Sequence, residues 1–107
     1  MSAFHAEGFV KDITTVGDSV SFKLEPAAPY IFEKKRDDGS VVRMLLFVDD
    51  ATNATKLIDE GRSFVGPQEV GFQSLIIAKA NRLKVRLTID KVKKGSLTIG
   101  VTSICVL

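Results

Sequence analysis

The stretch Leu83–Val92, LKVRLTIDKV, carries the clearest fold signal in this sequence. Every second one of its first eight residues is apolar, namely Leu83, Val85, Leu87 and Ile89. A period of two is typical of a β-strand with one face in the core and the other in water. We therefore predict a strand with an aliphatic buried face and an exposed face that carries Lys84 and Arg86.

The remaining chain alternates in a similar way. Strands are predicted at Glu7–Thr15, Ser19–Glu25, Tyr30–Lys35, Ser40–Val48 and Ser96–Leu107. The dipeptide Asp38-Gly39 is a strong hairpin signal between the third and fourth of these. Capping residues and apolar spacing predict helices at Asp49–Gly61 and Phe72–Arg82, and residues 62–71 are expected to form a loop.

This order of elements favours a mainly β fold of the α+β class. One or two short helices precede the last β-hairpin, as in a small antiparallel Greek-key barrel of the oligonucleotide/oligosaccharide-binding (OB) type with about five strands. A split α+β sheet with its helices on one face is compatible with the same order. We expect the barrel, in a single domain over residues 1–107.

The segment from Phe72 to Val101, FQSLIIAKANRLKVRLTIDKVKKGSLTIGV, resembles the C-terminal half of toxin B-subunit OB barrels. The likeness lies in a helix, an Asn-containing turn, an alternating strand and a returning strand. That family forms rings and binds glycans, so the resemblance implies an OB barrel for this chain. The chain departs from the family in having no signal peptide and no disulfide pair. Since a shared fold does not fix function, no sugar binding is inferred.

Bulk properties exclude several classes of protein. One cysteine gives no internal disulfide, and no segment has the layout of a signal peptide or the length of a membrane span. We therefore expect a soluble, cytoplasmic protein. The net charge is only +2, but the positive charge is concentrated between Lys79 and Lys94.

The sequence also argues against catalysis and against a metal or cofactor. His5 is the only histidine, and Cys105 is one hundred residues away in an apolar strand, where burial would make its thiol inert. The paired acids fit turns, a helix cap and a helix surface, and the glycines form neither GxGxxG nor a P-loop. We expect a non-enzymatic binding module.

Single-stranded nucleic acid is the partner that we name first, because OB barrels bind such strands with basic grooves and aromatic platforms. The candidate residues are Lys84, Arg86, Lys91, Lys93, Lys94, Lys34, Lys35, Tyr30 and Phe32. The same lysines and arginine would also appear on a sheet face that is merely solvated. Self-association into a homo-oligomer, through Met44–Val48 or the terminal Ser103–Leu107, is the alternative. A small-molecule pocket in the barrel mouth is a third class.

Overall fold

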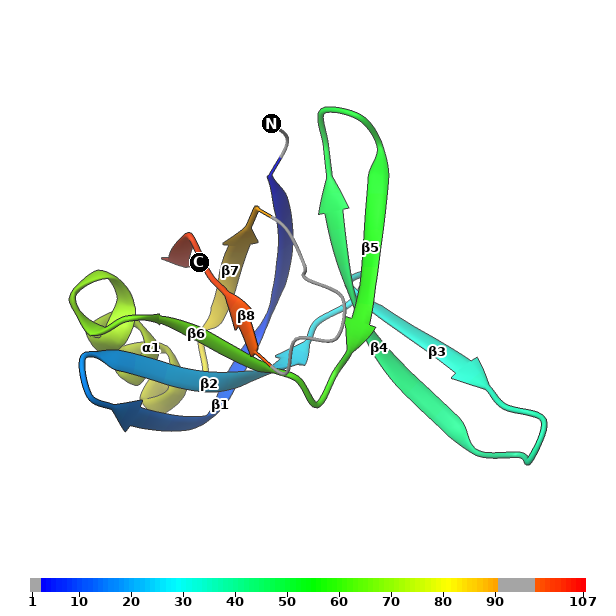
Figure 1. Cartoon of the computed structure of the whole chain (residues 1–107), viewed down its shortest axis with the longest axis horizontal. Coiled ribbons are helices and arrows are strands. Elements are labelled where there is room, and N and C mark those ends of the chain that lie inside the picture. The colour runs from blue at the N-terminus through cyan, green and yellow to red at the C-terminus, as the bar shows by residue number, and fades with distance from the viewer. Residues whose placement is uncertain (1–2, 91–97) are drawn as a thin grey trace.

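The computed structural model describes residues 3–90 and 98–107 (Figure 1). Within these residues the chain forms nine strands, all in one curled sheet, and one helix. The fold is therefore mainly β, as predicted, but it has more strands than the five or so that we expected. The elements are β1 Phe4–Val16, β2 Ser19–Pro26, β3 Ile31–Lys35, β4 Val41–Asp49, β5 Ala54–Asp59, β6 Ser63–Pro67, α1 Gln68–Asn81, β7 Lys84–Ile89, β8 Thr98–Gly100 and β9 Ser103–Val106.

The sheet is organised around β1, which pairs antiparallel with β2 along one edge and with β7 along the other. β2 pairs antiparallel with β6, and β6 pairs in parallel with β8. β9 follows β8 after two residues and pairs back with β7. These pairings curl the sheet into an open half-barrel with an apolar interior.

The interior is built by alternation along the strands. Val85, Leu87 and Ile89 of β7 are buried, and Leu83 packs against them from just before the strand. The predicted inward face of LKVRLTID is thus confirmed. β1 and β2 contribute in the same way, and the rings of Phe22 and Phe64 lie 5.6 Å apart in the centre.

Three strands form an arm on this body. We define the arm as residues 30–59, which include β3, β4 and β5. β4 is its middle strand, with β3 on one side and β5 on the other. One face of β4 sends Leu45 and Phe47 into the core, where Phe47 approaches Phe64 at 6.0 Å between ring centroids. The far end of the β3–β4 hairpin projects away from the body, on the side opposite α1 (Figure 1).

The predicted helix over Asp49–Gly61 is wrong, because this segment contains the turn of the β4–β5 hairpin and the strand β5. The Asp49 carboxylate accepts hydrogen bonds from the Ala51 N–H (2.8 Å) and from the Thr52 N–H and hydroxyl (3.3 and 2.8 Å). These bonds cap a turn rather than a helix, and Asn53 completes it with φ of 57°. The apolar stripe that suggested a helix is split between the two faces of β5.

The predicted loop over 62–71 is also wrong. It contains β6 and the first turn of α1, with Pro67 at the junction as the extended N-cap residue of the helix. The helix ends with Arg82 in the left-handed conformation at φ of 51°, close to the predicted end of the helix. The Asn81 side chain donates to the Ile77 carbonyl at 2.9 Å.

The predicted final strand is interrupted. Its described part forms β8 and β9, with Val101 and Thr102 between them. No helix among residues 3–90 and 98–107 is long and apolar enough to cross a membrane.

Candidate nucleic-acid interface

The outward face of β7 carries the two residues that the sequence placed there. Alternation turns Lys84 and Arg86 away from the core, and their side chains are 40% and 48% exposed. Lys91, Lys93 and Lys94, the other predicted cations of this region, lie outside the described residues. The described basic strand face therefore consists of Lys84 and Arg86.

Both cations are held by one carboxylate that the sequence interpretation missed. Glu7 of β1 lies directly across the ladder from Arg86. Its Oε2 accepts from Arg86 Nε at 3.0 Å and Nη2 at 2.6 Å, and Lys84 Nζ lies 3.6 Å from its Oε1. The Glu7 side chain is only 12% exposed. One nearly buried anion thus offsets part of the positive charge of this face.

The charges around Glu7 determine its protonation. The hydrogen bond from Arg86 is the main cause that lowers the pKa of Glu7, and the charges of Arg86 and Lys84 add to it. Burial acts in the opposite direction without reversing the result. The same contact raises the pKa of Arg86. Glu7 is therefore an anion at neutral pH, and the ion pairs are intact.

Tyr30 lies where the arm meets the outward face of β1. Its hydroxyl is 3.3 Å from His5 Nδ1, and the two rings meet edge to face at 5.7 Å. His5 Nε2 is in turn 2.7 Å from Asp50 Oδ2. Burial raises the pKa of Tyr30, and the nearby Glu7 carboxylate raises it further. Tyr30 is half-buried next to the Glu7–Arg86 pair. Because its pKa is raised, its hydroxyl is neutral at neutral pH.

The β3–β4 ladder relates Tyr30 to the other predicted residues of the arm. The Leu46 N–H donates to the Tyr30 carbonyl at 3.0 Å, which extends the ladder one residue before β3. Alternation then places Tyr30, Phe32 and Lys34 on one face of the hairpin and Lys35 on the other. Phe32 is 46% exposed, and Lys34 and Lys35 are exposed.

The two predicted clusters therefore share one surface. β4 pairs with β1 at Val48 and His5, so the face of the arm that carries Tyr30 continues onto the outward face of β1 and β7. We call this the outer surface and define it by Tyr30, Phe32, Lys34, Lys84 and Arg86. It combines two aromatic rings with three cations from segments about fifty residues apart.

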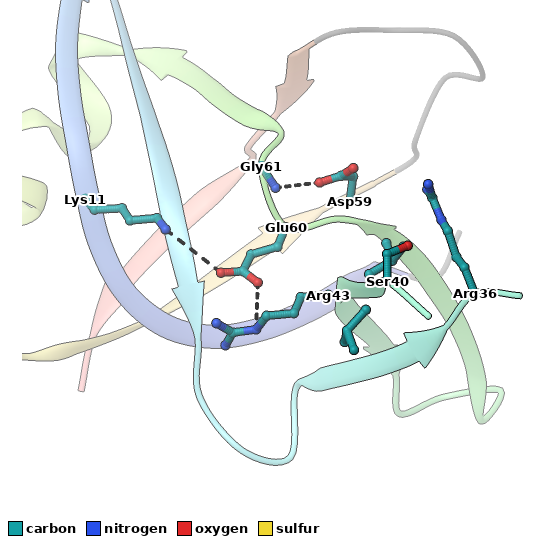
Figure 2. A pocket seen from close by; sticks show the side chains of 9 residues that line it. Lys11, Arg36, Ser40, Arg43, Asp59, Glu60 and Gly61 are labelled. Atoms are coloured by element: carbon teal, nitrogen blue, oxygen red, sulfur yellow. Dashed lines mark hydrogen bonds and ion pairs between the residues drawn. The ribbon is translucent and has the colours of Figure 1, made fainter. Parts of the chain in front are cut away.

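A second charged cluster lies at the base of the projecting hairpin. Figure 2 shows Glu60 between Lys11 and Arg43, with Glu60 oxygens 3.9 Å from Lys11 Nζ and 3.0 Å from Arg43 Nε. The Glu60 side chain is largely buried, like that of Glu7. The cluster borders an open hollow of about 520 Å³, lined by Lys11, Arg36, Ser40, Val41, Val42, Arg43, Asp59, Glu60 and Gly61.

The turn of this hairpin is fixed by its own side chains. The Asp38 carboxylate accepts from the Ser40 N–H at 2.8 Å and from the Ser40 hydroxyl at 2.6 Å. These hydrogen bonds lower the pKa of Asp38. Lys34, Lys35 and Arg36, beside this turn, form no ion pair within the described part of the chain. Their charges are therefore available to an anionic partner.

Cys105 does not lie where we expected it. Ile104 and Val106 of β9 pack against the core, and Cys105 between them is exposed, opposite Arg86 across the ladder. Cys105 therefore lies next to Arg86, at the edge of the outer surface. Residues 3–90 and 98–107 contain no group of three or more His, Cys, Asp or Glu side chains placed to hold a metal ion.

No protein family, curated protein or solved structure matches the chain.

Proposed function

We propose that this chain is a non-enzymatic binding module built on an OB-type barrel. The support is the circuit of strand pairs from β1 through β2, β6, β8 and β9 to β7 and back to β1. With β8 and β9 counted as one interrupted strand, the circuit has five strands. The helix lies between the third and fourth, as in OB barrels. The arm is then an insertion between the second and third.

The ligand that we propose is single-stranded nucleic acid, bound across the outer surface in the cytoplasm. The observation that supports it best is the position of Tyr30, which joins Phe32 and Lys34 of the arm to Lys84 and Arg86 of the body. Single-stranded binding needs cations for the backbone and rings for the bases, each stacked base contributing roughly 1–3 kcal/mol. Phe32 is the exposed ring beside an unpaired lysine.

The test is a titration of a labelled oligothymidylate of about 20 nucleotides, longer than the roughly 4–16 that one OB barrel covers. Between about 50 and 200 mM salt, the logarithm of the affinity should fall linearly with the logarithm of salt, with a slope near −0.7 per phosphate contact. Lys34→Gln should make this slope shallower by up to about 0.7. Lys79→Gln, on the exposed surface of α1, is the charge-matched control. Absence of binding at the lowest salt would rule out the proposal.

Cys105 offers a second readout that needs no substitution. It is the only cysteine of the chain, and it is exposed across the ladder from Arg86. A bound strand should slow its reaction with a small thiol reagent at low salt, and high salt should restore the rate. A reaction rate that is indifferent to saturating oligothymidylate would exclude the β7 side of the outer surface.

Self-association is the second candidate, and the same face of the arm favours it. Phe32 and Leu57 are each 46% exposed there, and Met44, Leu46 and Val48 are half-buried. Alternation and the β4–β5 register place these side chains together, away from the core. Light scattering should then give a mass that rises with concentration and that Leu57→Lys returns to monomer. A monomeric mass at every concentration would remove this candidate.

A further inference from the structure

Glu7 is the anion that Arg86 and Lys84 contact on the outer surface. Arg86 directs two N–H groups at one carboxylate oxygen, at 3.0 and 2.6 Å, and Lys84 lies 3.6 Å from the other oxygen. An arginine fork plus a lysine is the arrangement that recognises phosphate as well as carboxylate. The cations of this face are thus already bound to an anion of the protein itself.

Exposure differs between the two sides of this contact. The Glu7 side chain is 12% exposed, whereas those of Lys84 and Arg86 are 40% and 48% exposed. A ligand from solvent therefore reaches the cations more easily than the carboxylate. Arg86 keeps further N–H groups for a second acceptor, since a guanidinium has five and two point at Glu7.

We propose that Glu7 is a built-in competitor for the phosphate groups of a single strand at Lys84 and Arg86, and that it limits the affinity of the outer surface. The inference rests on the proposed function, because it names how that same surface is regulated. The negative charge of Glu7 lies within 4 Å of both cations and reduces what an approaching phosphate gains there. Removing that charge should therefore strengthen binding.

Glu7→Gln is the decisive variant, because Gln has the same shape and its carbonyl oxygen can still accept from Arg86. The matched control is Glu25→Gln. Glu25 lies on the neighbouring strand β2, is exposed, and forms no ion pair with any described residue. Both variants remove one negative charge, but only Glu7→Gln removes it from beside Lys84 and Arg86.

The measurement is the affinity for the labelled oligothymidylate at three salt concentrations. Glu7→Gln should bind roughly tenfold more tightly at about 50 mM salt, with a steeper salt slope, as expected for one further phosphate contact. Glu25→Gln should stay within about twofold of the wild type, because its charge is not paired with a cation. The double variant with Glu7→Gln and Arg86→Gln should lose the gain, which ties the effect to Arg86.

The outcomes separate this inference from the proposed function. Wild-type binding with equal effects of Glu7→Gln and Glu25→Gln would overturn the competitor role and leave the function in place. Absence of binding by the wild type and by Glu7→Gln at the lowest salt would overturn both. A gain in the double variant equal to that of Glu7→Gln would also overturn the role. Unfolding midpoints measured in parallel verify that each variant is folded.

Discussion

Glu7 links the stability of the fold to pH. Its pKa is lowered in the folded chain, chiefly by Arg86, so the unfolded chain takes up the proton first as pH falls. The stabilisation by this carboxylate is complete above its ordinary pKa of 4.5 and is lost as pH falls through the lower folded value. In urea unfolding, we expect the stability advantage of wild type over Glu7→Gln to shrink below about pH 4.5.

Glu25→Gln serves as the control for that comparison as well. Glu25 has no cationic partner in the described chain, so its removal should leave the acid dependence of unfolding like that of the wild type. A constant difference between wild type and Glu7→Gln from neutral pH to pH values well below 4.5 would contradict the ion pairs described for Glu7.

Gly8, the next residue, is required for a different reason. It is buried in β1 opposite Pro26, and a Cβ at this position would collide with the carbonyl oxygen of Glu25. We expect Gly8→Ala to lower the free energy of unfolding by about 1–3 kcal/mol, the usual cost of overpacking. In Gly100→Ala, no described heavy atom lies within 4 Å of the new Cβ, so unfolding should change little. Equal effects in both variants would refute the close approach of β1 and β2.

Single residues also mark the limit of prediction from sequence. The outward position of Arg86 followed from alternation, which needs only its neighbours along the chain. Its partner Glu7 lies 79 residues away in the sequence, and a ladder register that joins β1 to β7 has no local signal. The contact between Tyr30 and His5, which are 25 residues apart, likewise has no local signal in the sequence. Of the predicted residues, Phe32, Lys34, Lys35, Lys84 and Arg86 lie on strands, whereas the contact of Arg86 with Glu7 could not be predicted from the local sequence.

At the scale of elements, strands were predictable where apolar and polar residues alternate without turn or helix signals among them. β2 and β7 alternate clearly: β2 ends one residue beyond the predicted Ser19–Glu25, and β7 covers Lys84–Ile89 of the predicted stretch. β5 failed because Asp49 can cap a turn as well as a helix, and the choice depends on pairing with β4. β6 failed because Gly66 and Pro67 are typical of loops, although β2 supplies the partner that orders them.

The projecting end of the β3–β4 hairpin should be dispensable for folding. Glu33 and Arg43 face each other across the ladder, so residues 34–42 can be replaced by the two-residue turn Asn-Gly. Residues 34–41 are exposed, and the free energy of unfolding should change by no more than about 0.5 kcal/mol. Oligothymidylate binding should weaken, with a shallower salt slope, because Lys34, Lys35 and Arg36 are removed.

A large loss of stability in that variant would mean that the projecting hairpin supports the body. Unchanged stability with unchanged binding would place the ligand on the body alone, at Lys84 and Arg86. Urea unfolding and oligothymidylate affinity should be measured on the same preparation. Unfolding tests whether the hairpin supports the body, and affinity tests whether the hairpin contacts the ligand.

The whole molecule combines a curled body with an arm, and the two differ in how their strands are supported. β1 is paired on both edges, and its inward residues lie in the core. The far part of the hairpin has two strands and is exposed on both faces. Two-stranded hairpins are at best marginally stable in water. Ladder pairing and burial therefore predict a gradient of local stability from the body to the end of the arm.

Hydrogen exchange should reveal this gradient. Backbone amides of β1 and β7 should exchange only through global unfolding, whereas those of Lys34, Lys35 and Val42 should open at much lower free energy. A partner that covers the arm would change this pattern. Protection that rises with protein concentration would indicate self-association, and protection that appears only with oligothymidylate at low salt would indicate nucleic-acid binding. Equally strong protection of body and hairpin in dilute, ligand-free protein would contradict the exposed hairpin, since its amides would then have to be buried within one chain.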